Sequence, residues 1–132
     1  MNVEQRILEK KSSKDIILKY PELFGEPPFD MMKTLIGFGF ECGYGWYPIL
    51  EELFEKMHRY VTENDLNVKV VQVKEKFGGL RVYCHGHDDK TIRDMIREAE
   101  NKAEVTCETC GKPGTLSTNG WWKVTCDEHK NS

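Results

Sequence analysis

Apolar residues recur at helical spacing in two stretches of the chain, residues 48–63 and 89–104. Pro48 suits the first turn of one helix, and Asp88 or Asp89 can cap the other. The apolar positions are Ile49, Leu50, Leu53, Phe54, Met57 and Val61 in the first stretch, and Ile92, Met95, Ile96, Ala99 and Ala103 in the second. Both stretches are predicted to be amphipathic helices. A shorter helix is expected around Ile16 and Tyr20, ending at Pro21.

Residues 68–85 are predicted to form a β-hairpin with Gly78-Gly79 as a two-residue turn of the primed type. That turn pairs Phe77 with Leu80 and Lys76 with Arg81. The face expected in the core then carries Val71, Val73, Phe77, Leu80, Val82 and Cys84, with Glu75 as its one polar member. The opposite face carries Gln72, Lys74, Lys76, Arg81, Tyr83 and His85.

The stretch from Phe29 to Trp46 is apolar and rich in glycine. Its bulky residues alternate with Gly37, Gly39, Gly43 and Gly45. Alternation of this kind predicts an extended segment whose backbone closely approaches another strand or a ligand. Residues 21–29 contain three prolines and are predicted to form an irregular loop.

Four metal-ligand side chains occur in two pairs near the C-terminus, each pair on a two-residue spacer. They are Cys107, Cys110, Cys126 and His129, with fifteen residues between the pairs. This spacing is typical of a structural zinc site with a complete tetrahedral set of ligands. Such a site has no open position for a substrate, so zinc is expected to stabilise the fold. The alternative is that these cysteines form a disulfide or stay free.

Together these patterns predict an α+β fold. An antiparallel sheet around the 68–85 hairpin is packed by the two long helices. The α+β domain is expected to span residues 1–105, and a small zinc-binding module residues 106–132. A short hairpin is expected within the module around Thr118-Asn119-Gly120.

Composition narrows the class of protein. The chain has 132 residues, 39% of them hydrophobic, which suits one modest globular domain. Residues 1–11 are polar and charged and no apolar run approaches the length of a membrane span, so a cytoplasmic location without a signal peptide or membrane contact is expected. The net charge of −3 disfavours general coating of nucleic acid, although a local basic face remains compatible with it.

The polar face of the hairpin is the first candidate binding site. Lys74, Lys76 and Arg81 gather there beside Tyr83, and like charges opposite one another on strands favour an anion between them. The Gly-rich segment with Glu41 and Trp46 is expected to complete this site, because backbone N–H groups before a helix can bind an anion. The ligand class would be an anionic small molecule, most simply a nucleotide. The alternative is a solvated outer face of the sheet, or pairing of these cations with the acidic residues of helix 48–63.

Other candidates rest on fewer residues. Cys42 could be a nucleophile with His58 or His85 as its base, and Glu75 could be a buried acid or base. His85 and His87 could hold a second metal, while the Trp121-Trp122 pair could pack the module or bind a partner. None of these completes a known catalytic motif, so no catalytic residue is assigned.

Three blocks of sequence stand out: GFECGYGWYPIL, preceded by Gly37, VVQVKEKFGGLRVY at 70–83, and CETCGKPG…GWWKVTCDEH at 107–129. In these blocks the chain resembles a family of small bacterial and phage proteins. Phage accessory proteins of this size often counter host defence, by binding a defence protein or sequestering a nucleotide signal. The resemblance assigns no site residue. It does not extend to residues 1–36, so it implies no role for them.

Three functions remain open. The favoured one is a non-enzymatic zinc-containing protein that binds an anionic, nucleotide-like ligand through Glu41, Trp46, Lys74, Lys76, Arg81 and Tyr83. The second is an interaction module that inhibits a host or defence enzyme. The third is a small enzyme that uses Glu41, Glu75 or Cys42.

Overall fold

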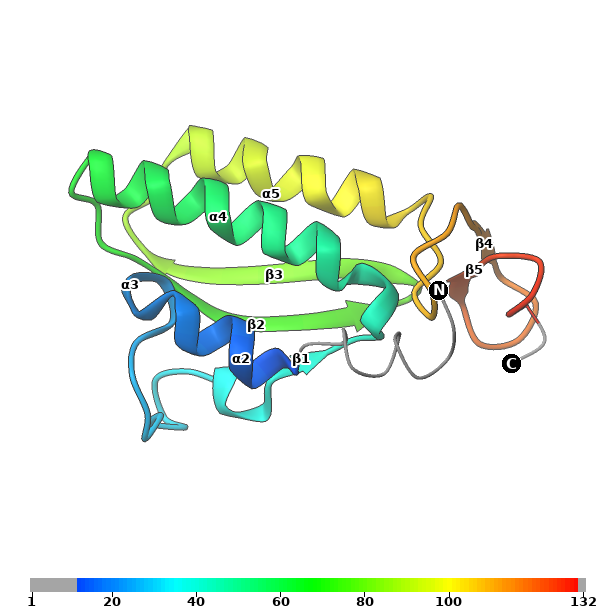
Figure 1. The fold of residues 1–132 in the computed structure, drawn as a ribbon, viewed down its shortest axis with the longest axis horizontal. Coiled ribbons are helices and arrows are strands. Elements are labelled where there is room, and N and C mark those ends of the chain that lie inside the picture. The colour runs from blue at the N-terminus through cyan, green and yellow to red at the C-terminus, as the bar shows by residue number, and fades with distance from the viewer. Residues whose placement is uncertain (1–11, 131–132) are drawn as a thin grey trace.

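The computed structural model describes residues 12–130 of the chain and confirms the α+β class (Figure 1). The helices are α2 (Ser13–Lys19), α3 (Pro21–Phe24), α4 (Tyr47–Glu63) and α5 (Lys90–Ala103). The strands are β1 (Phe40–Glu41), β2 (Val68–Lys76), β3 (Gly79–Gly86), β4 (Thr115–Ser117) and β5 (Lys123–Thr125). Short 3₁₀ turns cover Ile36–Phe38 and Tyr44–Trp46.

The main sheet has the strand order β1-β2-β3 and is mixed, whereas the sequence predicted an antiparallel sheet. Strands β2 and β3 form the expected antiparallel hairpin. The short strand β1 lies parallel to β2, with Phe40 opposite Val73 and Glu41 opposite Lys74. The Gly-rich segment therefore approaches a neighbouring strand, which is one of the two alternatives that its sequence left open. Strands β4 and β5 form a separate two-stranded sheet.

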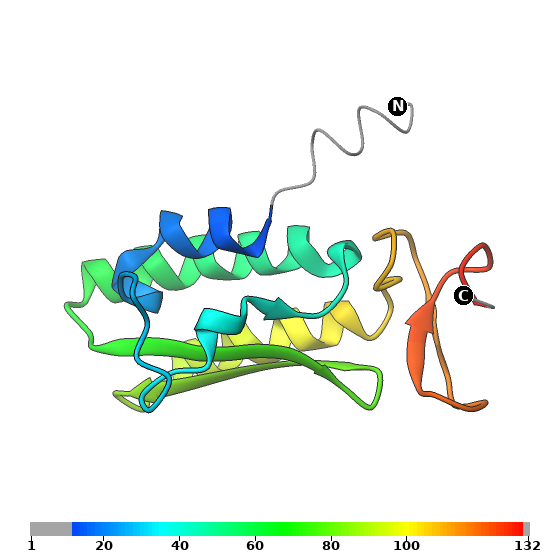
Figure 2. The same ribbon diagram turned by 90° about the horizontal axis from the view of Figure 1, so that it is seen from below.

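The described helices all cover the same face of the main sheet, as Figure 2 shows. Helix α4 buries Leu50, Leu53, Phe54 and Met57, the positions that its sequence period predicts. Helix α5 packs on α4 and β3 through small residues, Ala99 and Ala103, together with Ile92. Both predicted long helices are thus confirmed. None of the helices in residues 12–130 is long and apolar enough to cross a membrane.

The turn of the hairpin lies one residue earlier than the sequence predicted. Lys76 pairs with Gly79, so the two turn residues are Phe77 and Gly78, with φ angles of 52° and 80°. Positive φ at both positions is typical of a type I′ turn. The Glu75 carboxylate supports this turn by accepting the N–H of Gly78 at 2.6 Å. The predicted register is therefore wrong: Lys74 lies opposite Arg81, and Glu75 opposite Leu80.

This shift moves Phe77 out of the core. Its side chain is 71% exposed, although the sequence placed it among the buried residues. Leu80 and Val82 are buried as predicted. A register shift between Val70 and Gln72 brings Val70 to the core face together with Val73. The extra residue, Val71, is only half-buried, and its carbonyl accepts the N–H of Leu35 at 2.8 Å.

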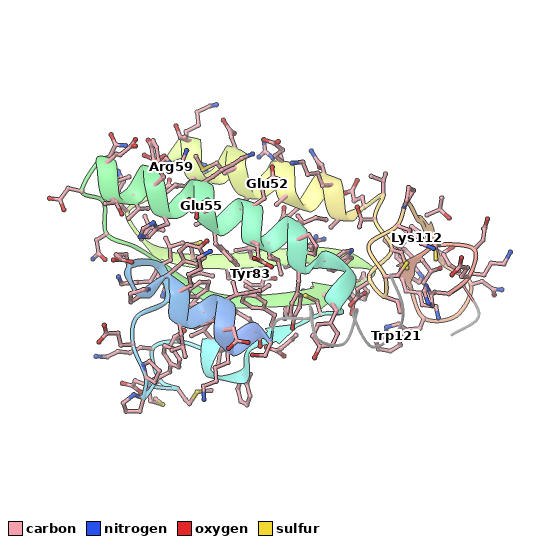
Figure 3. All side chains as sticks on the ribbon, in the orientation of Figure 1. Glu52, Glu55, Arg59, Tyr83, Lys112 and Trp121 are labelled. Carbon is pink, nitrogen blue, oxygen red and sulfur yellow. The ribbon has the colours of Figure 1, made fainter. Side chains whose placement is uncertain are left out.

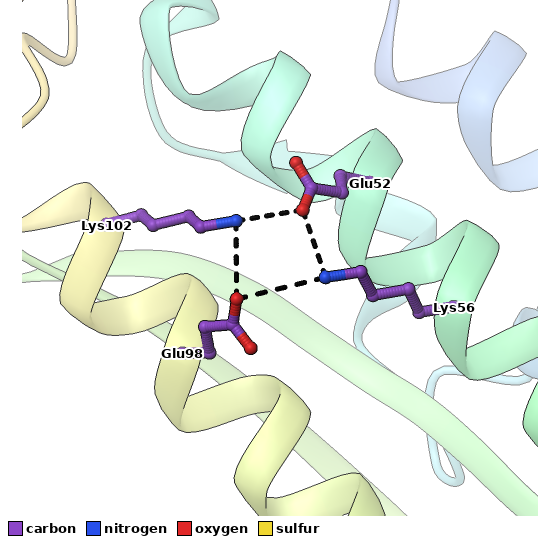
Figure 4. Close-up of polar contacts among 4 residues, drawn as sticks. All are labelled: Glu52, Lys56, Glu98 and Lys102. Carbon is purple, nitrogen blue, oxygen red and sulfur yellow. Dashed lines mark hydrogen bonds and ion pairs between the residues drawn. The ribbon is translucent and has the colours of Figure 1, made fainter.

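Charged side chains tie α4 to α5 at the surface (Figure 4). Lys102 of α5 lies 2.8 Å from the Glu52 carboxylate of α4, and Lys56 of α4 lies 3.9 Å from that of Glu98. Lys56 and Lys102 also contact the acidic residue of their own helix, at 3.0 and 3.5 Å. The two cations and two anions thus form a closed ring that neutralises its own charge.

Candidate functional site

The four predicted metal ligands lie together in the described C-terminal segment. One ligand atom from each of Cys107, Cys110, Cys126 and His129 lies within 4.8 Å of all the others. The Sγ atom of Cys126 is 3.2 Å from Nδ1 of His129 and 3.6 Å from Sγ of Cys110. Three sulfur atoms and one imidazole nitrogen at this spacing can hold a metal ion, and the donor set suits Zn²⁺.

Tight turns bring the members of each ligand pair together. In the first turn, Gly111 donates its N–H to the carbonyl of Cys107 at 2.9 Å, and Cys107 donates to Lys112 at 2.7 Å. In the second, His129 donates its N–H to the carbonyl of Cys126 at 3.1 Å. Gly111 has a φ of 85°, which explains why a glycine follows Cys110. The local sequence therefore determines the geometry within each ligand pair.

The surroundings of Cys107 favour a thiolate, the form that binds metal. Burial opposes ionisation, but backbone N–H groups of Cys126, Cys110 and Thr109 outweigh it and lower the pKa of Cys107 to about 6. Burial raises the pKa of Cys110. All five cysteines of the chain are free thiols in the structure, so the disulfide alternative is not adopted.

The segment with the four candidate metal ligands (residues 106–130, the C-terminal module) is docked on the Gly-rich segment before α4. Gly45 donates its N–H to the carbonyl of Glu108 at 2.7 Å, and Gly43 donates to the Glu108 carboxylate at 2.8 Å. A Cβ atom at Gly45 would lie 2.1 Å from the carbonyl oxygen of Cys107, and one at Gly43 would lie 2.4 Å from that of Glu108. Only glycine allows this approach.

The backbone donors predicted to bind an external anion are therefore occupied within the chain. Glu108 supplies the anion itself, and it follows directly on the first metal ligand. Burial raises the pKa of Glu108, while the Gly43 N–H favours its ionised form. The alternation of glycines indicated a close backbone approach, but no signal in the sequence identified Glu108 as the partner.

The hairpin tip makes the second contact with the C-terminal module. The Phe77 and Trp122 rings meet edge to face with centroids 6.4 Å apart. A Cβ atom at Gly78 would lie 2.6 Å from the Leu116 side chain and 3.3 Å from the backbone nitrogen of Lys123. Val124 of β5 is 1% exposed and belongs to the main core. The module thus contacts the main domain at two places, the Gly-rich segment before α4 and the tip of the β2–β3 hairpin.

Trp46 belongs to this docking region and does not reach the sheet surface. Its side chain is fully buried, and its indole N–H donates to the carbonyl of Thr106 at 2.9 Å. The structure therefore separates Trp46 from the other residues predicted to bind the ligand, because a buried indole cannot stack on an external molecule.

The remaining predicted ligand-binding residues share the face of the sheet that the described helices leave uncovered (Figure 2). Glu41, Lys74 and Arg81 lie side by side across the three strands. Gln72 lies opposite Tyr83 one pair further along, and Lys76 follows at the end of β2. We call this surface the open face; its residues are Glu41, Gln72, Lys74, Lys76, Arg81 and Tyr83.

The lysines of the open face have no acidic partner in the part of the chain that the structure describes. Among residues 12–130, Lys74 and Lys76 form no ion pair, and the Lys74 ammonium lies 5.7 Å from the centroid of the Tyr83 ring. Glu41 instead accepts a hydrogen bond from the Gln72 amide at 3.3 Å. Arg81 curls towards the hairpin turn and donates to the Leu80 carbonyl at 2.9 Å, so part of its guanidinium is already engaged.

Among residues 12–130, no histidine forms a hydrogen bond with Cys42. Burial, followed by the charges of Glu108 and Glu75, raises the pKa of the Cys42 thiol to about 12, which opposes thiolate formation at neutral pH. His58 instead pairs with Glu22 at 3.1 Å. Within the part of the chain that the structure describes, the C-terminal cluster is the one group of metal-ligand side chains, and it excludes His85 and His87.

Sequence reasoning also missed a pocket at the other end of β2. It has a volume of about 280 Å³ and lies between the loop after α3 and the start of the strand, where Lys33, Lys69, His85 and Phe29 are among its lining residues. The Lys69 ammonium is held there by the carbonyl of Glu22 at 2.7 Å. Because a loop remote in sequence forms one wall, no local pattern indicated this pocket.

Comparison of the chain with protein-family models, curated proteins and solved structures gives no match. Function is therefore inferred from the geometry of the molecule itself.

Proposed function

We propose that this is a non-enzymatic, zinc-containing binding protein whose open face takes an anionic, nucleotide-like ligand. One observation carries the proposal: Lys74 and Lys76 form no ion pair within residues 12–130 and lie beside Tyr83, on a sheet face that the described helices leave uncovered. Lysine and arginine bind phosphate, and an exposed ring can stack a base. Zinc would occupy the Cys₃His cluster and hold the C-terminal module in place.

The contrast with the helical side supports this choice. Several cations on the helices form ion pairs: Lys56 and Lys102 belong to the ring with Glu52 and Glu98, and Arg59 contacts Glu55 at 3.4 Å. Figure 3 shows Glu52, Glu55 and Arg59 on that side of the molecule. In a protein of net charge −3, two neighbouring lysines without an ion pair in the described part of the chain favour a local anionic ligand.

The test is calorimetric titration of nucleoside mono- and triphosphates, with inorganic phosphate alongside, into wild type and variants. Lys74→Ala should weaken nucleotide binding by about tenfold or more, as expected for one charge-assisted contact. Arg81→Ala should weaken it too, and Arg81→Lys should recover only part because lysine lacks the planar fork. The matched control is Arg59→Ala, which removes a cation on α4, away from the open face. This variant should bind the nucleotide as wild type does. Equal affinity in all variants would place the ligand elsewhere.

A second function rests on a different surface. Trp121 is 81% exposed and lies on the C-terminal module at the end of the molecule (Figure 3). Exposed tryptophan is enriched among residues that dominate protein interfaces. On the resemblance to phage proteins, the partner would be a host or defence enzyme. Inhibition of a purified defence enzyme by wild type but not by Trp121→Ala, with nucleotide binding absent, would favour this reading.

A further inference from the structure

We propose that the open face binds a single-stranded nucleic acid, and that the strand continues over the hairpin tip onto Trp122. This inference rests on the proposed function and names the class of its ligand. It adds two residues, Phe77 and Trp122, that the anion-binding argument does not use.

Rings and cations alternate along one line of the surface. Tyr83 lies beneath the Lys74 ammonium, and Lys76 follows two residues further along β2. The Lys76 ammonium lies 5.9 Å from the Phe77 ring, whose centroid is 6.4 Å from that of Trp122. Alternate residues of a strand are spaced by roughly 6–7 Å. This spacing suits an extended polynucleotide whose bases stack on the rings while its phosphates meet the lysines.

The C-terminal module makes the line continuous. Gly78 lies against Leu116 and the backbone of Trp122 and Lys123, so the hairpin tip and the module meet without a side chain at Gly78 between them. Figure 2 shows that the β4–β5 hairpin projects beside the tip of β2–β3, towards the side of the open face. Metal binding in the module would therefore position the last stacking ring.

The exposure of the aromatic rings favours a single-stranded nucleic acid over a mononucleotide as the ligand. Tyr83 is 39% exposed, Trp122 46% and Phe77 71%, so these rings form a surface along the molecule and do not enclose a single base. Composition favours nucleic acid over protein, because the cores of protein interfaces are depleted in lysine whereas this surface contains Lys74 and Lys76. Single strands are favoured over duplexes because only unstacked bases can stack on side-chain rings.

The experiment measures fluorescence anisotropy of labelled oligo(dT) and oligo(U), with lengths from one nucleotide to roughly fifteen. Affinity should rise with length over the first few nucleotides and then level off. Tyr83→Ala and Phe77→Ala should each weaken binding by about 5- to 100-fold, whereas Tyr83→Phe should retain affinity because the ring remains. With three cations engaged, log K should fall against log salt with a slope of about −2, and Lys74→Ala should reduce that slope by about 0.7.

Matched controls lie away from the line. Phe38 is a 69% exposed aromatic beside α2, and Phe38→Ala should bind as wild type, as should Arg59→Ala on α4. Circular dichroism of each variant checks that the fold is retained. Phe77 and Tyr83 are exposed, so loss of binding in these variants can be separated from unfolding.

Four outcomes are distinguishable. Length-dependent binding that depends on the Tyr83 and Phe77 rings supports the inference. Binding that is independent of length but weakened by Lys74→Ala overturns it and leaves the proposed nucleotide site standing. A labelled duplex of matched length is titrated alongside, and equal affinity for the duplex and the single strand also overturns the inference, because a duplex cannot present unstacked bases. Failure to bind any nucleotide or oligonucleotide overturns both proposals.

Discussion

The helices and the C-terminal module are attached to the same sheet in different ways. The helices bury apolar side chains on its face: Leu50, Phe54 and Met57 of α4 are fully buried, as are Val73 and Leu80 of the sheet. The module is held at the sheet's end by hydrogen bonds from Gly43, Gly45 and Trp46 to its backbone and to Glu108, with Val124 as its buried apolar contact.

The two kinds of attachment should tolerate different substitutions. Apolar packing is spread over many side chains, so its cost scales with the volume that a substitution removes. Attachment through glycine depends on a few close approaches, where one added methyl group displaces backbone. Substitutions in the helix layer should therefore lower stability by graded amounts. A single substitution at a docking glycine should be enough to detach the module. Four experiments test this contrast, in order of expected effect.

Removing the metal should have the largest effect and should be confined to the module. Structural zinc contributes on the order of 10 kcal/mol to the folding of such a segment. Cys110→Ser, or chelation of the metal, should unfold residues 106–130 and leave the helix-covered sheet folded. Amide NMR spectra check this by showing collapse of the module's resonances alone. Metal analysis should give one zinc per chain, and a markedly lower content would contradict the assignment.

Truncating the core should destabilise the whole domain. Leu80 is fully buried beneath the helices, and Leu80→Ala should lower the free energy of unfolding by about 2–5 kcal/mol. Urea denaturation followed by far-UV circular dichroism measures the loss. Phe77→Ala is the matched control on the same hairpin and should cost much less, because that side chain is mostly exposed. Equal costs would contradict the turn at Phe77-Gly78.

A methyl group at Gly45 should separate the module from the sheet. Its Cβ would lie 2.1 Å from the Cys107 carbonyl oxygen, so the module must move and the cost should be about 1–3 kcal/mol or more. Gly37→Ala is the control, because its Cβ would press only on the flexible Met31 sulfur at 3.1 Å and would lie at ordinary contact distance, 3.7 Å, from the Phe29 Cβ. Limited proteolysis near residue 106 should accelerate in the first variant alone. Similar rates in both would indicate that the glycine contact is not limiting.

The charge ring on the helical side should matter least. Glu52→Gln removes the anion shared by Lys56 and Lys102, yet all four side chains are largely exposed to solvent. Exposed ion pairs contribute little, so the loss should stay below about 1 kcal/mol and vanish at high salt. Thermal denaturation at two salt concentrations measures it. A loss comparable with that of Leu80→Ala would mean that charge holds the helices in place.

The two long helices and the candidate metal ligands could be predicted from local sequence. Helices α4 and α5 were predictable because their signals are local: the apolar period and the first-turn residues all lie within the helix itself or beside its first turn. The Cys-x₂-Cys and Cys-x₂-His pairs bring their ligands together through turns of four residues. Lys74, Arg81 and Tyr83 share the predicted face because alternation along a strand survives an error in the turn.

The hairpin register, the docking of the C-terminal module and the residues that share the open face depend on tertiary contacts. The turn lies at Phe77-Gly78, where the Gly78 backbone fits closely against Leu116 and Trp122 of the module. The bulge at Val71 depends on a hydrogen bond from Leu35, far away in the chain. Gly45 and Trp46 serve the module because Glu108 and Thr106 lie opposite them. Each of these contacts joins residues distant in sequence, so its energy exists only once the chain has folded, and no local pattern can encode it.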